Sequence, residues 1–125
     1  MEKKWWHHLT AYQIYTRSFC DSNGDGIGDF QGIISKLDYL QELGIGAIWI
    51  SPFNDSPNYD NGYDISDYYA ILKDFGTMAD LEEMIQECEN RDIIVMMDLV
   101  LNHCSHEHPW FLGACKDRNG KYHDY

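Results

Sequence analysis

Three short runs of apolar residues along the chain predict buried β-strands. They are AYQIY at 11–15, GIGAIWIS at 44–51 and DIIVMMDLV at 92–100. Nearly continuous apolar runs of this length are typical of parallel strands that are buried on both faces of a sheet. Pro52 has no backbone N–H to donate to a neighbouring strand, so it marks the end of the second run.

Two stripes of apolar residues at helical spacing separate these runs. The first stripe consists of Phe30, Ile33, Ile34, Leu37, Leu40 and Leu43. It predicts a helix that Gly44 ends. The second follows a predicted capping box between Thr77 and Asp80 and consists of Met78, Leu81, Met84, Ile85 and Cys88. Strands and helices therefore alternate, which predicts an α/β fold with a parallel sheet.

The connections between these elements differ in length. Each helix joins the next strand through about three residues, at 44–46 and at 90–92. The links that follow the strands are long and polar, at 16–29, 51–76 and 101–125. In parallel β/α folds such links emerge at the carboxyl ends of the strands, where ligands bind. The pattern predicts a ligand site on that face.

Composition and charge limit the kinds of partner. With 44% hydrophobic and 24% charged residues, the 125-residue chain has the composition of a globular protein. Nine Lys and Arg residues against 21 Asp and Glu residues leave a formal charge of −12, which repels nucleic acids and anionic membrane surfaces. Neutral ligands and cations are the expected partners, and no feature indicates a protein partner.

Three further features predict a cytoplasmic location. The longest apolar stretch, at 93–101, is too short to span a bilayer and is interrupted by Asp98. The amino terminus, MEKKWWHH, lacks the apolar core of a secretory signal. The four cysteines form no C-x-x-C pair, which favours free thiols in a reducing compartment.

The acidic stretch DSNGDGIGD at 21–29 offers the oxygen donors of a calcium loop. Five candidate ligands occupy its odd positions, namely the side chains of Asp21, Asn23, Asp25 and Asp29 and the carbonyl of Ile27. Gly32 stands where an EF-hand has its closing glutamate, so the loop is not an EF-hand. A turn built from Asx side chains and glycines, with no ion, is the alternative.

A second polar stretch, NYDNGYDISDYY at 58–69, alternates carboxylates and amides with aromatic rings. Aromatic rings pack on the apolar face of a sugar, and Asp and Asn bind its hydroxyls. This combination predicts a carbohydrate site. The alternative is a polar loop whose tyrosines only pack on the protein surface.

A third stretch, DLVLNH at 98–103, follows the last apolar run. Asp98 lies near the carboxyl end of that strand, where a charge must be paired or belong to a site. Asn102 and His103 then lie at the predicted ligand face, although a structural role for Asp98 is the alternative. A competing interpretation of this segment is a zinc site formed by HCSHEH at 103–108 with Cys115. The spacing of these residues matches no common zinc pattern, and a loop with solvated histidines also explains the segment.

Three ordered segments resemble a known family. They are YQIYTRSFCDSNGDGIGDFQGI, then SP followed by DNGYDISDY and FGTMADLEEMI, then MMDLVLNHCSHEHPWF. From about Trp5 to Tyr125 the chain resembles the amino-terminal end of oligo-1,6-glucosidases and related α-glucosidases, members of the α-amylase superfamily of glycoside hydrolases. The resemblance implies the first three β/α units of a (β/α)8 TIM barrel, left incomplete, in residues 1–101, and the start of an inserted small domain in residues 102–125.

The resemblance also implies roles for individual residues. The loop at 21–29 would bind a structural calcium ion, with magnesium as the alternative. Asp60 would hydrogen-bond the terminal glucose of an α-glucoside, Tyr63 would stack beneath it, and His103 would bind a hydroxyl of the same sugar. Asp98 would orient the polar groups around it.

The catalytic groups of the family are expected beyond Tyr125. Retaining hydrolysis needs a nucleophile and an acid/base carboxyl about 5 Å apart, and in the family both lie on later strands. We expect the chain to be the amino-terminal part of a retaining α-glucosidase that acts on terminal α-linked glucose in short oligosaccharides, with isomaltose-type α-1,6 bonds. We expect the chain to be inactive by itself. The alternative is a non-catalytic calcium- or sugar-binding remnant. A closed barrel takes about 250 residues, so the third strand is expected to be an unpaired edge.

Overall fold

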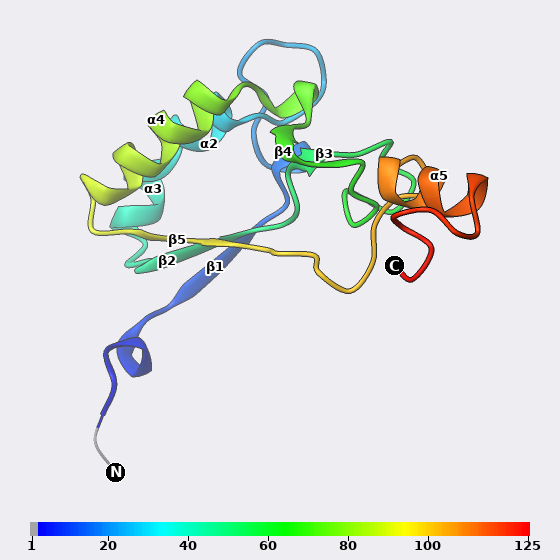
Figure 1. Ribbon diagram of the computed structural model, residues 1–125. Helices are drawn as coiled ribbons and strands as arrows, with labels where there is room; N and C mark the ends of the chain where they lie inside the picture. The colour runs from blue at the N-terminus through cyan, green and yellow to red at the C-terminus, as the bar shows by residue number, and fades with distance from the viewer. Residues whose placement is uncertain (1–2) are drawn as a thin grey trace. The chain divides into compact units, whose positions relative to one another are not determined.

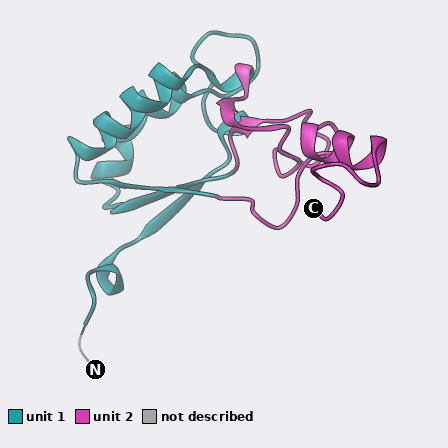
Figure 2. Ribbon diagram, in the orientation of Figure 1, with its two compact units in different colours: residues 1–51, 74–98 teal, residues 52–73, 99–125 magenta. Residues whose placement is uncertain are grey.

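The computed structural model describes residues 3–125, which form two compact units (Figure 2). Unit 1 contains the described residues up to Ser51 together with Asp74–Asp98. Unit 2 contains Pro52–Lys73 and Leu99–Tyr125. Each unit therefore combines two segments that are distant in the sequence.

Unit 1 is built on a three-stranded parallel sheet with its long helices on one face (Figure 1). The strands are β1 (Ala11–Ile14), β2 (Ala47–Ile50) and β5 (Ile94–Met97), and β2 is central. In the register of the sheet, Ala47 lies opposite both Ala11 and Ile94. All three strands predicted from the apolar runs are confirmed, although each strand is shorter than its run. The predicted burial on both faces is corrected for β5, where Ile94, Met96 and Met97 are 38%, 40% and 43% exposed, because within residues 3–125 β5 is an edge strand.

The first apolar stripe forms two helices rather than one, so that prediction is corrected. They are α2 (Phe30–Ile34) and α3 (Leu37–Glu42). Between them the hydroxyl of Ser35 donates to the carbonyl of Gly32 at 2.7 Å, and the N–H of Lys36 bonds the carbonyl three residues earlier. Such local bonds compete with the regular α-helical pattern, which explains the break.

Gly44 ends α3 as predicted. Its φ of +81° is the left-handed conformation that glycine adopts without strain. The N–H of Ile45 donates to the carbonyl of Leu40 at 3.1 Å, and the N–H of Gly44 donates to Gln41 at 2.9 Å. These two bonds form a Schellman motif, which turns the chain directly into β2.

The second stripe forms one helix, α4 (Met78–Glu89), with the predicted capping box. The hydroxyl of Thr77 accepts from the N–H of Asp80 at 3.3 Å, and the Asp80 carboxylate accepts from the N–H of Thr77 at 2.7 Å. The side-chain amide of Gln31, on α2, donates to Asp80 at 3.0 Å and to Glu83 at 2.7 Å. These contacts join α2 to α4.

The core of unit 1 lies between the helices and one face of the sheet. Its fully buried side chains are Ile14, Phe30, Ile33, Leu37, Leu40, Ile48, Ile50, Met84 and Cys88. The other face is open, since Trp49 and its register partner Met96 are each 40% exposed. In the described part of the chain β5 pairs only with β2, so the expected edge strand is confirmed.

Several short elements lie in the links that the apolar pattern left without helices or strands. They are η1 (Trp5–His8), α1 (Thr16–Phe19), β3 (Asn54–Asp55), β4 (Asp67–Ile71), η2 (Lys73–Phe75) and α5 (Pro109–Lys116). In unit 2, β3 and β4 pair antiparallel. These elements are too short or too polar to produce a clear periodicity. No helix within residues 3–125 has the length and apolar character needed to cross a membrane.

Candidate functional site

The acidic loop 21–29 of unit 1 is organised around the carboxylate of Asp21. Its Oδ1 accepts from the N–H groups of Asn23 at 3.0 Å and Gly24 at 2.7 Å, and its Oδ2 accepts from Gly26 at 2.8 Å. The N–H groups of Gly24 and Gly26 are the main reason that the pKa of Asp21 lies below its ordinary value. The loop therefore holds this carboxylate in its charged form.

The same turn chemistry continues along the loop. The amide oxygen of Asn23 accepts from the N–H of Asp25 at 2.9 Å, and the Asp25 carboxylate accepts from Ile27 at 2.8 Å. Gly24 and Gly26 adopt φ values of +86° and +88°, which glycine tolerates best. The loop is thus a series of Asx turns. Both predicted alternatives, a calcium loop and a turn without an ion, require this local structure.

Asp29 connects the loop to α2. Its Oδ1 accepts from the N–H of Gly32 at 2.6 Å and caps the helix, while its Oδ2 accepts from the hydroxyl of Ser22 at 2.8 Å. Asp29 is only 5% exposed. Both of its oxygens have partners within the protein, as do those of Asp21, but Asp29 is buried whereas Asp21, Asn23 and Asp25 are exposed.

The donor chemistry of the loop fits a hard cation. Carboxylate, amide and carbonyl oxygens are the ligands of calcium and magnesium, and each carboxylate oxygen that accepts one N–H keeps a second lone pair. Within residues 3–125, no three His, Cys, Asp or Glu side chains converge as a metal cluster. The binding of an ion by Asp21, Asn23, Asp25, Ile27 and Asp29 stays a prediction.

In unit 2 the buried carboxylate of Asp64 organises the loop that carries Asp60. Its Oδ1 accepts from the hydroxyl of Ser56 at 2.9 Å and from the N–H of Asp60 at 3.1 Å, and its Oδ2 accepts from the N–H of Tyr59 at 2.9 Å. Burial acts to raise the pKa of Asp64, but these three hydrogen bonds outweigh burial and the pKa lies below its ordinary value.

Sequence reasoning missed Asp64. Its neighbours in DNGYDISDY suggested a carbohydrate site, but the pattern contains several acidic residues and does not show which of them points inward. Asp64 is 9% exposed, whereas Asp60 is exposed. The structure thus separates the buried carboxylate of Asp64, which holds the loop, from the exposed carboxylate of Asp60.

The loop around Asp60 bends through three left-handed residues. Asn58, Asn61 and Gly62 have φ values of +63°, +54° and +93°. Asn tolerates this conformation better than most residues do, and at Gly62 a Cβ would lie 2.8 Å from the carbonyl oxygen of Pro52. The sequence N-Y-D-N-G is therefore suited to present Asp60 at the tip of a tight bend.

His103 is joined to the same loop across 40 residues of sequence. Its Nε2 lies 3.0 Å from the carbonyl oxygen of Tyr63, and because a carbonyl only accepts, Nε2 carries the hydrogen. Its Nδ1 then accepts from the side-chain amide of Asn102 at 3.3 Å. The structure brings two of the predicted sugar-binding residues, Tyr63 and His103, into direct contact.

Asp98 belongs to unit 1, unlike Asp60, Tyr63 and His103. It follows the last residue of β5, and its N–H donates to the carbonyl of Ile50 at 3.1 Å. Asp98 is half-buried. Its place directly after the end of a parallel strand agrees with the sequence prediction, and its orienting role stays a prediction.

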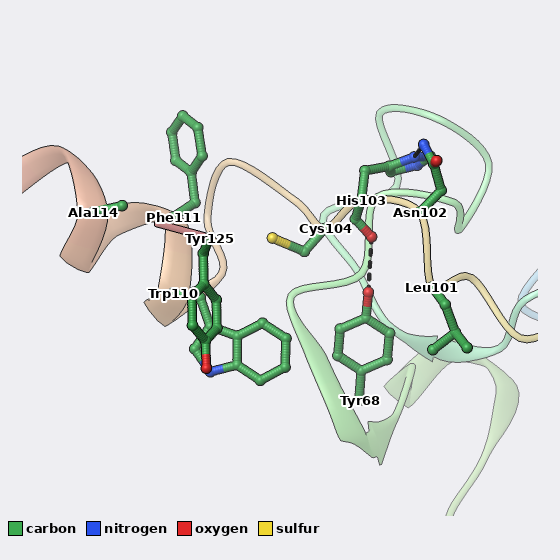
Figure 3. Close-up of a pocket in the computed structure, with 9 residues that line it drawn as sticks. All are labelled: Tyr68, Leu101, Asn102, His103, Cys104, Trp110, Phe111, Ala114 and Tyr125. Atoms are coloured by element: carbon green, nitrogen blue, oxygen red, sulfur yellow. Dashed lines mark hydrogen bonds between the residues drawn. The ribbon is translucent and has the colours of Figure 1, made fainter. Parts of the chain in front are cut away.

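A pocket of about 480 Å³ lies within unit 2 beside His103 (Figure 3). It is lined by Tyr68, Leu101, Asn102, His103, Cys104, Trp110, Phe111, Ala114 and Tyr125. The competing zinc cluster does not form among the described residues. One of its candidates, His108, instead accepts the N–H of Trp110 at Nδ1 and caps α5, at 3.1 Å.

Comparison with protein families matches residues 13–125 to the alpha-amylase catalytic domain. The chain belongs to the alpha-amylase family. Among curated relatives, the oligo-1,6-glucosidase of Bacillus cereus is 61% identical over all 125 residues, and the glucan 1,6-alpha-glucosidase of Streptococcus pneumoniae is 58% identical. This alpha-amylase family chain spans 22% and 23% of the length of those two proteins.

Solved structures of alpha-amylase relatives share the fold. The isomaltulose synthase of Klebsiella sp. LX3 superimposes with a TM-score of 0.98 at 54% identity, over 100% of this chain and 22% of that protein. The trehalose-6-phosphate hydrolase of Bacillus licheniformis superimposes with a TM-score of 0.95 at 51% identity, over 98% of this chain and 22% of that protein. The fold of this chain is thus shared with part of these alpha-amylase relatives.

Proposed function

We propose that the chain is the amino-terminal part of a retaining α-glucosidase that hydrolyses terminal α-linked glucose in short oligosaccharides, with isomaltose-type α-1,6 bonds preferred. The observation that carries the proposal is the 61% identity to an oligo-1,6-glucosidase across the whole chain. The activity is a property of the complete protein, because this chain spans 22% of that relative.

The geometry of unit 2 supports a glucose-binding role for its loop. The exposed carboxylate of Asp60 accepts hydrogen bonds from sugar hydroxyls, while its backbone is held by Asp64. The ring of Tyr63 stacks on the apolar face of the glucose. His103 accepts a hydrogen bond from a sugar hydroxyl at Nδ1. The sugar hydroxyl replaces the exposed amide of Asn102 as the donor to this nitrogen.

The catalytic step itself requires groups outside this chain. We assign residues 1–101 to the barrel and residues 102–125 to the start of an inserted domain, with Asp98 orienting polar groups at the end of β5. The open face of the sheet, with Trp49 and Met96 partly exposed, is then covered by the remaining strands of the barrel. The nucleophile and the acid/base carboxyl lie on those later strands.

The test is an assay of the complete protein on isomaltose, maltose, trehalose and sucrose. We expect the highest kcat/KM on isomaltose. Early in a proton NMR time course α-glucose should exceed its equilibrium share, because retention preserves the anomer of the glucose unit that is cleaved off. A purified protein of residues 1–125 should release no glucose. Inactivity of the complete protein on all four sugars, or release of glucose by the short chain, contradicts the proposal.

We further propose a cytoplasmic protein in which the loop at 21–29 binds one structural calcium ion. The donor set supports this assignment, and magnesium is the competing ion because it also takes oxygen ligands. When bound, the ion neutralises the carboxylates of Asp21 and Asp25, which otherwise repel each other. The loop lies in unit 1, apart in sequence from the proposed sugar ligands, so the ion contributes stability rather than chemistry.

A further inference from the structure

The hydroxyl of Tyr68 joins the two chain segments of unit 2. It lies 2.9 Å from the carbonyl oxygen of Val100. It also lies 2.8 Å from the carbonyl oxygen of His103 (Figure 3). Both carbonyls can only accept, so the phenol is the donor and shares its single hydrogen between them. One hydroxyl therefore fixes both ends of the segment 100–103.

The ring of Tyr68 is held by contacts that do not involve its hydroxyl. It stacks on Trp110 with centroids 5.8 Å apart and planes at 24°, and it lies 5.7 Å from His108. Its backbone carbonyl accepts from the side-chain amide of Asn54 at 2.9 Å, which links β4 to β3. Removal of the hydroxyl alone should leave this packing in place.

The segment that Tyr68 fixes carries His103, and the ring of His103 meets the loop of Tyr63 at 3.0 Å. A continuous series of hydrogen bonds thus runs from the phenol through the backbone of His103 to its imidazole and on to the carbonyl of Tyr63. Burial raises the pKa of Tyr68, so the phenol keeps the proton that it donates.

We propose that Tyr68 is a positioning residue, which sets the place of the His103 imidazole and, through it, of Tyr63. The proposal rests on the proposed α-glucosidase function for the meaning of the His103 site. It goes beyond that function because it assigns a role to a residue outside the set of sugar ligands. Tyr68 acts through His103 and needs no contact with the substrate.

The first test is Tyr68→Phe in the complete protein, with Tyr69→Phe as the matched control. Tyr69 is the next residue of β4 and is 90% exposed. We expect Tyr68→Phe to raise KM for isomaltose about fivefold, the factor for one hydrogen bond. We expect kcat to stay nearly unchanged, because the substrate and the transition state lose the same binding free energy. Tyr69→Phe should change neither constant. A lower melting temperature with unchanged KM contradicts the positioning role.

A double-mutant cycle shows whether Tyr68 acts through His103. In a His103→Ala background the effect of Tyr68→Phe on kcat/KM should disappear, because no imidazole is left to position. If Tyr68→Phe lowers kcat/KM by the same factor in both backgrounds, the two residues act independently and the proposal is wrong.

A crystal structure of the complete Tyr68→Phe protein provides a readout that does not depend on activity. We expect the His103 Nε2 to move out of hydrogen-bond distance of the Tyr63 carbonyl while the ring of residue 68 stays in place. An unchanged contact overturns the positioning role. If the unmodified protein cleaves no α-glucoside, the proposed function fails separately, and this structure still decides the role of Tyr68.

Discussion

The buried carboxylate of Asp64 accepts a hydrogen bond from the backbone N–H of Asp60 at 3.1 Å. The same carboxylate also accepts from Ser56 and from the N–H of Tyr59. Asp64, which is only 9% exposed, therefore fixes the backbone of Asp60, whose own carboxylate is exposed. We infer that the position of Asp60, and with it the proposed contact to glucose, depends on Asp64.

Replacement of Asp64 should disturb the site without removing a sugar ligand. Asp64→Ala leaves one hydroxyl and two N–H groups without their acceptor, and bonds to a charged group contribute about 1.5–3 kcal/mol each. We expect a lower melting temperature of the complete protein and a KM for isomaltose raised by about tenfold. Asp67→Asn is the control, because Asp67 is exposed and its carboxylate accepts from the N–H of Tyr69, away from the backbone of Asp60. Equal effects of the two variants contradict this role.

The stability that Asp64 contributes should depend on pH. Its pKa is lowered in the folded protein, so the contribution is present above its ordinary pKa of 3.8 and is lost as the pH falls through the lowered value. We expect the difference in melting temperature between the unmodified protein and Asp64→Asn to be largest at neutral pH. Melting curves from pH 7 down to pH 3 test this, and a difference that stays constant or grows in acid argues against it.

The acidic loop can be tested for calcium through the response to a chelator. Asp21→Ala removes backbone hydrogen bonds as well as a proposed ligand, so a lower melting temperature alone is not decisive. We expect calcium to raise the melting temperature of the complete protein and to have no effect on the double variant Asp21→Ala, Asp25→Ala. Asp38→Ala, on the surface of α3, is the control that should keep the calcium response. Equal responses to a chelator in all three proteins mean that the loop is a turn without an ion.

Tyr63→Ala tests the stacking assignment. Aromatic contacts contribute about 1 kcal/mol beyond their buried area, so we expect KM to rise at least fivefold in the complete protein. Tyr59→Ala is the matched control in the same loop, because Tyr59 is 75% exposed. The backbone carbonyl of Tyr63 remains in the variant, and the contact with His103 can persist. Unchanged kinetic constants remove Tyr63 from the site.

The strands and the second helix could be predicted from the sequence because their cause is local. Apolar side chains at helical or strand spacing favour a helix or strand with one face toward the core, and the caps at Thr77 and Gly44 use neighbouring backbone groups. The break between α2 and α3 was missed, because the apolar spacing continues through Ser35 while its hydroxyl changes the hydrogen bonding. β3 and β4 were missed because their pairing joins distant residues.

The sequence by itself determined the order of the three parallel strands and of the helical segments between them, the exposed edge of the sheet and the residue types of the acidic and aromatic loops. Only the tertiary structure decided which carboxylate of the second loop is buried, and that His103 meets Tyr63 and Tyr68. Those contacts join residues 40 and 35 positions apart, and no local spacing specifies them. They form because hydrogen-bonding groups on two separate segments must find partners once the segments pack together in unit 2.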